Sequence, residues 1–293
     1  MKISGFTFLR NGVQYDYPFQ ESILSLLPLV DELIVVVGKG SDSSLQAIQG
    51  LANKHSKIQI HETTWDESLR KDGLILSQQT NLAMEKCTGD WGIYLQADEV
   101  LHEEDYEKIR AALAEADRHP KVEGLLFDYL HFYGDFFIVN WNPSAYRHEV
   151  RAVRLKRGVV SWKDAQGFRI VKNGDFAKLN VLSSQAKIYH YGWVRPQEVM
   201  QQKTKAMDQL YHADGGGTGN NYLYKRIYGL ERFSGTHPAV MDERIATKRW
   251  KIDLLASPLV FTWKDIRKVI VRWIEKVTGW LPFEYRNYKR IKL

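Results

Sequence analysis

The first hundred residues alternate between short apolar segments and helix-like segments, and this alternation is the strongest constraint on the fold. Residues 32–37 form a continuous, largely β-branched run, which fits a strand buried on both faces, as in a parallel sheet. Further strands are expected at residues 2–8, 58–60 and 91–95, with apolar residues at helical spacing between them. The sequence therefore predicts an α/β fold with a Rossmann-like sheet flanked by helices.

The charge of the chain is concentrated at its C-terminal end. Residues 244–293 contain thirteen Lys and Arg against four Asp and Glu, a net charge of +9, whereas the whole chain carries +6. We therefore divide the chain into a near-neutral domain, residues 1–240, and a basic extension, residues 241–293. A basic tail on such a body argues against a nucleic-acid-binding body and for an anionic partner of the tail, such as a membrane surface or RNA.

The extension contains one long amphipathic pattern. Its apolar positions fall on one helix stripe: Ile266, Val269, Ile270, Trp273, Ile274 and Val277. Its basic residues lie on the other side: Lys264, Arg267, Lys268, Arg272 and Lys276. Trp280, Phe283 and Tyr285 follow as aromatic anchors. The stripe must either pack on the near-neutral domain or lie in a lipid interface, and the expected partner is an anionic membrane surface rather than a nucleic acid.

The expected compartment is the cytoplasm, with peripheral attachment at the inner face of the membrane. A single cysteine, Cys87, excludes an internal disulfide. The N-terminal residues lack the apolar stretch and cleavage site of a signal peptide. The longest apolar run near the C-terminus, residues 254–263, is too short to cross a bilayer.

One acidic motif carries the candidate chemistry. Residues 94–99 read Tyr-Leu-Gln-Ala-Asp-Glu, so an apolar strand ends in Asp98 and Glu99. Ligands of open α/β sheets bind at the carboxyl ends of the strands, and a carboxylate there can hold a divalent cation that bridges a diphosphate. The alternative is an acidic turn that caps the helix expected from Glu103.

Several motifs occur in an order that resembles family-2 glycosyltransferases. The first strand leads into Arg10 and Asn11, the second into a Ser/Asp turn at residues 40–44, and an Asn-bearing helix at residues 79–83 precedes the acidic motif. The resemblance covers about residues 1–200. It implies a GT-A fold, a nucleotide-sugar donor, with UDP as the expected nucleotide, and a divalent cation, Mn²⁺ or Mg²⁺.

The resemblance also indicates which residues bind the donor and the metal. The donor is expected on Arg10, Asn11, Asp42, Lys71 and Gln96. Asp98 is expected to bind the metal, together with a late histidine, His190, which ends an apolar strand. A neutral imidazole with a carboxylate suits Mn²⁺. The alternative for His190 is a partly buried imidazole that bonds to a backbone carbonyl.

Two departures from the family pattern affect this site. Gln96 stands where the family usually has the first Asp of its acidic motif. The carboxylate that usually follows the second strand and contacts the nucleoside is replaced by Val37 or Gly38. Metal binding therefore depends mainly on Asp98, and nucleoside recognition must differ from the common pattern.

An inverting transfer needs a carboxylate that accepts the proton of the acceptor hydroxyl. We favour Asp164, which lies in a polar turn between expected strands, with Glu149 as its rival and Asp128 third. The alternative for each is an ion pair with a nearby arginine, for example Glu149 with Arg147 or Arg151.

The sequence therefore predicts an inverting glycosyltransferase that uses a nucleotide sugar and a glycan or lipid-linked acceptor, as in cell-surface polysaccharide synthesis. A sugar-phosphate nucleotidyltransferase is the first alternative, but residues 9–12, Leu-Arg-Asn-Gly, are not its Gly-Thr-Arg loop. The second is a catalytically inactive relative that binds a glycan or acts as a scaffold, which Gln96 motivates.

Overall fold

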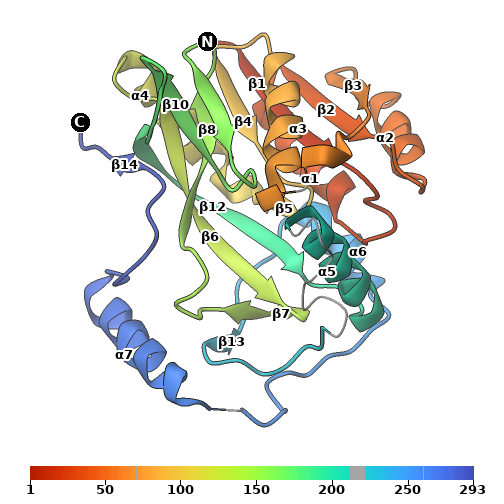
Figure 1. Cartoon of the computed structure of the whole chain (residues 1–293), viewed down its shortest axis with the longest axis vertical. Coiled ribbons are helices and arrows are strands. Elements are labelled where there is room, and N and C mark those ends of the chain that lie inside the picture. The colour runs from red at the N-terminus through yellow and green to blue at the C-terminus, as the bar shows by residue number, and fades with distance from the viewer. Residues whose placement is uncertain (70, 212–221, 260) are drawn as a thin grey trace.

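The computed structural model contains one large mixed sheet covered by helices (Figure 1). It describes residues 1–69, 71–211, 222–259 and 261–293. The strand order is β13-β7-β6-β8-β4-β1-β2-β3, and β12 pairs with β6, β5 and β14. A second sheet has the order β11-β10-β9.

The parallel half of the sheet comes from the first hundred residues. Its strands are β1 (Ile3–Leu9), β2 (Glu32–Gly38), β3 (Ile58–Thr63) and β4 (Trp91–Tyr94), and the intervening helices are α1 (Phe19–Leu26), α2 (Ser44–Ala52) and α3 (Leu74–Glu85). Along β2, Leu33, Val35 and Val37 enter one core cluster. Ile34 and Val36 enter the other. The prediction of a strand buried on both faces is confirmed.

The antiparallel half extends the sheet beyond β4. It contains β5 (Glu99–Leu101), α4 (Tyr106–Arg118), β6 (Gly124–Tyr133), β7 (Asp135–Asn140), β8 (His148–Arg154) and β12 (Asn180–Trp193). β8 pairs antiparallel with both β4 and β6, whereas β12 runs parallel to β6. The small sheet consists of β9 (Val159–Trp162), β10 (Gly167–Lys172) and β11 (Asp175–Ala177). The predicted α/β fold, a mixed sheet flanked by helices, is confirmed.

Short 3-10 turns join several of these elements. They are η1 (Leu27–Leu29), η2 (Glu67–Leu69), η3 (Lys71–Gly73), η4 (Glu103–Asp105) and η6 (Ala239–Met241). The Gly-rich segment 215–219 lies outside the described residues.

The C-terminal part wraps around the body and returns to the sheet (Figure 1). It contains α5 (Gln197–Tyr211), β13 (Leu230–Arg232), α6 (Asp242–Ala246), α7 (Trp263–Thr278) and β14 (Lys289–Arg290). β14 pairs with the start of β12, and Arg244 pairs with Asp16 and Glu21. No helix in the described part of the chain combines the length and the apolar character needed to cross a membrane.

Candidate active site

A cavity of about 580 Å³ lies at the carboxyl ends of β1 and β4. The loop after β1, the acidic motif, the end of β12, helix α5 and the β9–β10 turn all contribute to its wall. Six of the residues singled out from the sequence line it together: Arg10, Asn11, Gln96, Asp98, Asp164 and His190. Segments that are far apart in the chain therefore converge where ligands of α/β sheets bind.

Asp98 is the electrostatic centre of the cavity. It is buried, and the Nζ atom of Lys203 lies 3.0 Å from its Oδ2 atom, with a guanidinium nitrogen of Arg195 4.0 Å away. Burial alone would raise the pKa of Asp98, but Lys203, His190 and Arg195 hold that pKa well below its ordinary value. Asp98 is therefore an ionised carboxylate between the buried Arg195 guanidinium and the partly buried Lys203 ammonium.

The protonation of His190 follows from its hydrogen bond to His131. His131 Nε2 lies 2.8 Å from the carbonyl oxygen of Tyr146, which can only accept, so Nε2 carries the proton. Burial lowers the pKa of His131 well below its ordinary value, so its Nδ1 atom is a bare acceptor. His190 Nδ1, 2.8 Å away, must then be the donor. Since burial also lowers the pKa of His190, its Nε2 atom keeps a lone pair, 3.8 Å from Asp98 Oδ1.

The space beside these two groups fits a cation. A Cβ atom on Gly192 would lie 2.5 Å from His190 Nε2 and 3.1 Å from Asp98 Oδ2, so the glycine keeps this space open. An imidazole nitrogen with a carboxylate oxygen is a donor set suited to Mn²⁺. The described residues contain no group of three or more such ligands, so oxygens of a bound diphosphate would have to complete the coordination.

Asp164 enters the cavity from the tight turn between β9 and β10. Both neighbours, Lys163 and Ala165, have positive φ angles, of 53° and 61°. Such backbone is costly for residues other than glycine and clusters at functional sites. The Tyr211 hydroxyl donates to Asp164 Oδ2 at 3.1 Å, so α5 holds the carboxylate in place.

A buried ion pair anchors this turn to the acidic motif. Arg151 donates to both carboxylate oxygens of Glu99 at 2.8 Å and to the carbonyl oxygen of Gln166 at 2.9 Å. A bidentate pair of this kind fixes the geometry of both partners. Arg151 is fully buried and does not line the cavity.

The rival carboxylates lie elsewhere. Glu149 is buried outside the cavity lining, and the Gln166 amide donates to it at 2.9 Å. It pairs with neither Arg147 nor Arg151, because those arginines bind Glu275 and Glu99. Asp128 pairs with His148 at 3.4 Å, also outside the cavity lining. Of the three candidates, only Asp164 lines the cavity.

Burial raises the pKa of Glu149 to about 8 from an ordinary value of 4.5. Between these pH values the folded protein keeps a proton that the unfolded chain releases, so the contribution of Glu149 to stability is lost as the pH rises through 8. Glu149→Gln, which stays uncharged, should gain stability over the wild type by a few kcal/mol at pH 9, at about 1.4 kcal/mol per pKa unit. Urea unfolding at pH 5 and pH 9 measures this, and an equal difference at both pH values would contradict it.

Three of the five predicted donor-binding residues line the cavity. Arg10 and Gln96 line the cavity, as does Asn11, whose Oδ1 atom accepts a hydrogen bond from the Ser41 amide. Asp42 is outside the cavity lining, and its carboxylate accepts from the amides of Gln14 and Ser44. Lys71 lies in η3, but its side chain is outside the described part of the structure. Their roles in donor binding stay predictions.

The structure explains the missing carboxylate after the second strand. A Cβ atom on Gly38 would clash with the indole nitrogen of Trp65, which is therefore packed against the glycine backbone. The Arg10 guanidinium lies 4.9 Å from the centre of the Trp65 ring, and both residues line the cavity. The indole N–H has no hydrogen-bond partner among the described residues. An aromatic ring with a spare donor thus occupies this corner of the cavity.

Sequence reasoning missed the two cations beside Asp98 and the histidine behind His190. Lys203 and Arg195 belong to the α5 region and carry no pattern that distinguishes them from solvent-exposed charges. His131 did carry a signal, because it is a polar residue within the apolar strand β6.

No protein-family model and no curated protein matches this sequence. Among solved structures, the chain is similar to S. aureus TarS, with 15% identity and a TM-score of 0.43, over 72% of this chain and 42% of that one. For TarS 1–349 in complex with UDP-GlcNAc, the identity is 15% and the TM-score is 0.43, over 72% of this chain and 70% of that one. For the mannosyltransferase PcManGT from Pyrobaculum calidifontis, in complex with GDP-Man and Mn²⁺, the identity is 19% and the TM-score is 0.31, over 42% of this chain and 34% of that one. The chain spans less than half the length of TarS, and at TM-scores this low the likeness decides neither family nor function.

Proposed function

We propose that this chain is an inverting glycosyltransferase of the family-2 type that uses a nucleotide sugar, with UDP as the expected nucleotide. One observation carries the proposal. A single cavity at the strand ends holds a buried carboxylate between cations, Asp98, and a second carboxylate on its wall, Asp164. Such a site can bind a diphosphate and accept a proton beside it.

The charges support binding of a diphosphate. Lys203 and Arg195 carry two positive charges within 4.0 Å of the single negative charge of Asp98. Arg10 adds a third cation to the cavity lining. Asp164 and Asp208 add negative charge to the same lining, so the positive charge is in excess only around Asp98, where the two cations favour an anionic ligand.

Asp98 and His190 Nε2 would hold a divalent cation, Mn²⁺ or Mg²⁺, and Gly192 leaves the room for it. When bound, such a cation offsets the negative charge that develops on the leaving diphosphate. The protein's own residues would hold these two ligands in place. Lys203 and Arg195 orient Asp98, and the hydrogen bond between His190 and His131 leaves the lone pair of His190 Nε2 available to the cation.

In the proposed step, the acceptor hydroxyl oxygen forms a bond to the anomeric carbon while the bond from that carbon to the diphosphate oxygen breaks. Asp164 accepts the hydroxyl proton, and the nucleoside diphosphate leaves as an anion. The strained β9–β10 turn and the Tyr211 hydroxyl hold Asp164 at the cavity wall for this role.

We also propose a glycan or lipid-linked acceptor and a cytoplasmic enzyme that works at the inner face of the membrane. Residues 1–240 would carry the reaction, and the basic extension 241–293 would attach the protein to an anionic membrane surface.

A second candidate follows from Gln96. This amide lines the cavity where the family pattern has a carboxylate, which favours a catalytically inactive protein that binds a nucleotide sugar or glycan without transfer. Release of nucleoside diphosphate from a nucleotide sugar with Mn²⁺ separates the two candidates, because only the enzyme would turn over.

A thermal-shift panel of nucleotide sugars with Mn²⁺ tests the proposal, and UDP-GlcNAc and GDP-Man are the first donors to try. A ligand present at 100 times its dissociation constant stabilises a protein by about 2.7 kcal/mol, which raises the melting temperature by several degrees. We expect such a shift with at least one donor. If no nucleotide sugar and no nucleoside diphosphate shifts the melting temperature, the cavity does not bind this class of ligand.

A further inference from the structure

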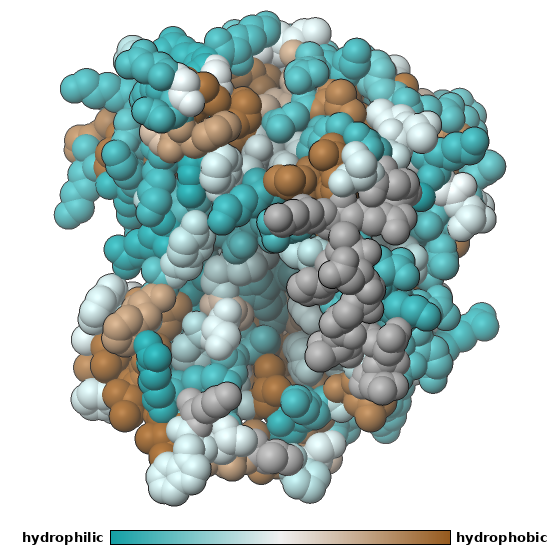
Figure 2. Space-filling model, viewed as in Figure 1, coloured by the Kyte–Doolittle hydropathy of each residue, from teal (hydrophilic) through white to brown (hydrophobic). Residues whose placement is uncertain are grey.

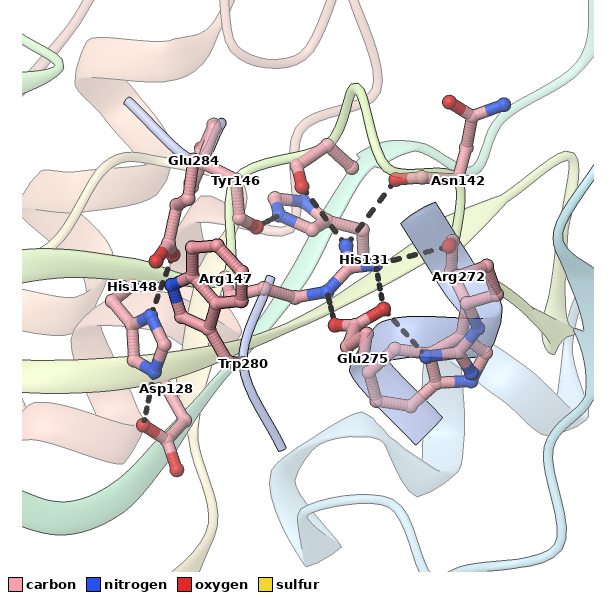
Figure 3. Close-up of polar contacts among 12 residues, drawn as sticks. Asp128, His131, Asn142, Tyr146, Arg147, His148, Arg272, Glu275, Trp280 and Glu284 are labelled. Atoms are coloured by element: carbon pink, nitrogen blue, oxygen red, sulfur yellow. Dashed lines mark hydrogen bonds and ion pairs between the residues drawn. The ribbon is translucent and has the colours of Figure 1, made fainter. Parts of the chain in front are cut away.

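Helix α7 contacts the body through its polar face rather than its apolar face (Figure 3). Glu275 accepts hydrogen bonds from Arg147 at 2.7 Å and from Arg272 at 2.8 Å. Arg272 and Lys276 also pair with Glu231 of β13, at 3.5 and 3.2 Å. Buried Val271 contributes an apolar residue to this face. As expected, the charged residues of this helix lie opposite the apolar stripe. Arg272 and Glu275, however, face the body of the protein.

The apolar stripe of α7 therefore faces away from the body. Trp263 is 88% exposed, and Trp273 and Val277 are each 65% exposed. Ile266 and Ile270 are also exposed, as are Trp280 and Phe283 beyond the helix. Figure 2 shows hydrophobic side chains gathered at the lower left, where Figure 1 places α7. The alternative in which the stripe packs on the core is wrong for these residues.

The helix is fixed at both ends, so the stripe is already formed. Thr262 and Asp265 make a reciprocal capping box at its start, and Gly279, with a φ angle of 68°, ends it. After the helix, Glu284 binds His148 at 2.7 Å, and β14 joins β12. The segment after the stripe is thus tied to the body.

Basic residues border the exposed stripe. Arg267 lies over the Phe283 ring at 4.7 Å, and Lys276 flanks the other side. The exposed basic residues Lys289 and Arg290 do not belong to this border, because β14 carries them back to the sheet. Apolar and aromatic side chains bordered by cations match the interface of an anionic bilayer, where apolar groups enter the acyl boundary and cations meet lipid headgroups.

We propose that α7 docks on an anionic lipid bilayer with its stripe in the interface, while its opposite face, with Arg272 and Glu275, binds the rest of the enzyme. This contact is connected to the cavity, because Arg147, which binds Glu275, directly follows Tyr146. The side chain of Tyr146 lines the cavity, and its carbonyl oxygen binds His131. One segment therefore fixes both the membrane-facing helix and the cavity wall. The inference rests on the proposed function only in placing the donor cavity beside a lipid-linked acceptor.

Co-sedimentation of the full chain with vesicles tests the proposal without any nucleotide. We expect the protein to pellet with vesicles of phosphatidylglycerol and phosphatidylcholine, less in high salt, and to stay in solution with phosphatidylcholine alone. The double substitution Trp263→Ser and Trp273→Ser should lower the partition coefficient by about 10-fold or more. Leu223→Ser, which removes another side chain that is 64% exposed, is the matched control and should bind like the wild type.

Three outcomes would overturn the proposal: no binding of the wild type to anionic vesicles at low salt, binding unaffected by the double substitution, or binding that ignores lipid charge and salt. If light scattering shows a dimer that the double substitution dissociates, a second copy covers the stripe and the bilayer assignment is wrong. A nucleotide-induced thermal shift in the same preparation would show that the proposed reaction site survives that result.

Discussion

Asp164→Asn should lower the rate of sugar transfer by about 10²- to 10⁴-fold while nucleoside diphosphate binding changes little. The amide cannot accept the proton of the acceptor hydroxyl, but it keeps the size of the carboxylate and can still accept from the Tyr211 hydroxyl. Because Asp164 is absent from the cluster around Asp98, the diphosphate contacts should survive. Turnover and calorimetric binding, measured on the same preparation, separate the two effects.

Glu149→Gln is the control for this experiment. Glu149 is the rival carboxylate, but it is buried outside the cavity lining and bonded to Gln166. Its substitution should leave transfer within a few-fold of the wild type near neutral pH. If Glu149→Gln abolishes transfer and Asp164→Asn does not, Glu149 is the base and the assignment of Asp164 is wrong.

Asp98→Asn should abolish both turnover and the Mn²⁺-dependent stabilisation by UDP. The substitution removes the carboxylate beside His190 Nε2 and leaves Lys203 and Arg195 without this anion. Breaking a buried ion pair in this way typically costs 3–5 kcal/mol, so a lower melting temperature is expected as well. Thermal shift and calorimetry with Mn²⁺ and UDP measure the loss of binding.

Asp105→Asn separates loss of binding from loss of stability. Asp105 is as buried as Asp98, at 6% exposure for each, but it lies outside the cavity lining and binds Lys108 and the Lys187 amide. This variant should be destabilised yet still respond to UDP and Mn²⁺. Equal affinity of Asp98→Asn and wild type for Mn²⁺–UDP would contradict the metal assignment.

The sequence predicted the elements whose signals are local. The β-branched run of β2 and the alternation around it predicted the parallel half of the sheet, because burial on both faces leaves a continuous apolar pattern. The acidic motif predicted a ligand site because the carboxyl end of a parallel strand faces a crevice. Asp98 was identified in this way, whereas His190 followed from the resemblance to family-2 glycosyltransferases and Asp164 from a polar turn between expected strands. All three line one cavity.

What the sequence did not predict depends on contacts between distant segments. Lys203 is about a hundred residues from Asp98, and a lysine on an amphipathic helix usually lies on its solvated face. Only the packing of α5 over the sheet buries it. Which face of α7 contacts the body could not be predicted either. Its stripe was evident, but the ion pairs that turn its polar face inward involve Arg147 and Glu231 of other strands and loops.

The release of nucleoside diphosphate from a panel of nucleotide sugars tests the central claim most directly. The wild type with Mn²⁺ should release nucleoside diphosphate from at least one donor, faster when a glycan or lipid-linked acceptor is present. Asp98→Asn should release none, and Asp105→Asn should retain the activity. Binding of a donor without release, with every acceptor tried, would contradict the account and leave the inactive binding protein as the function.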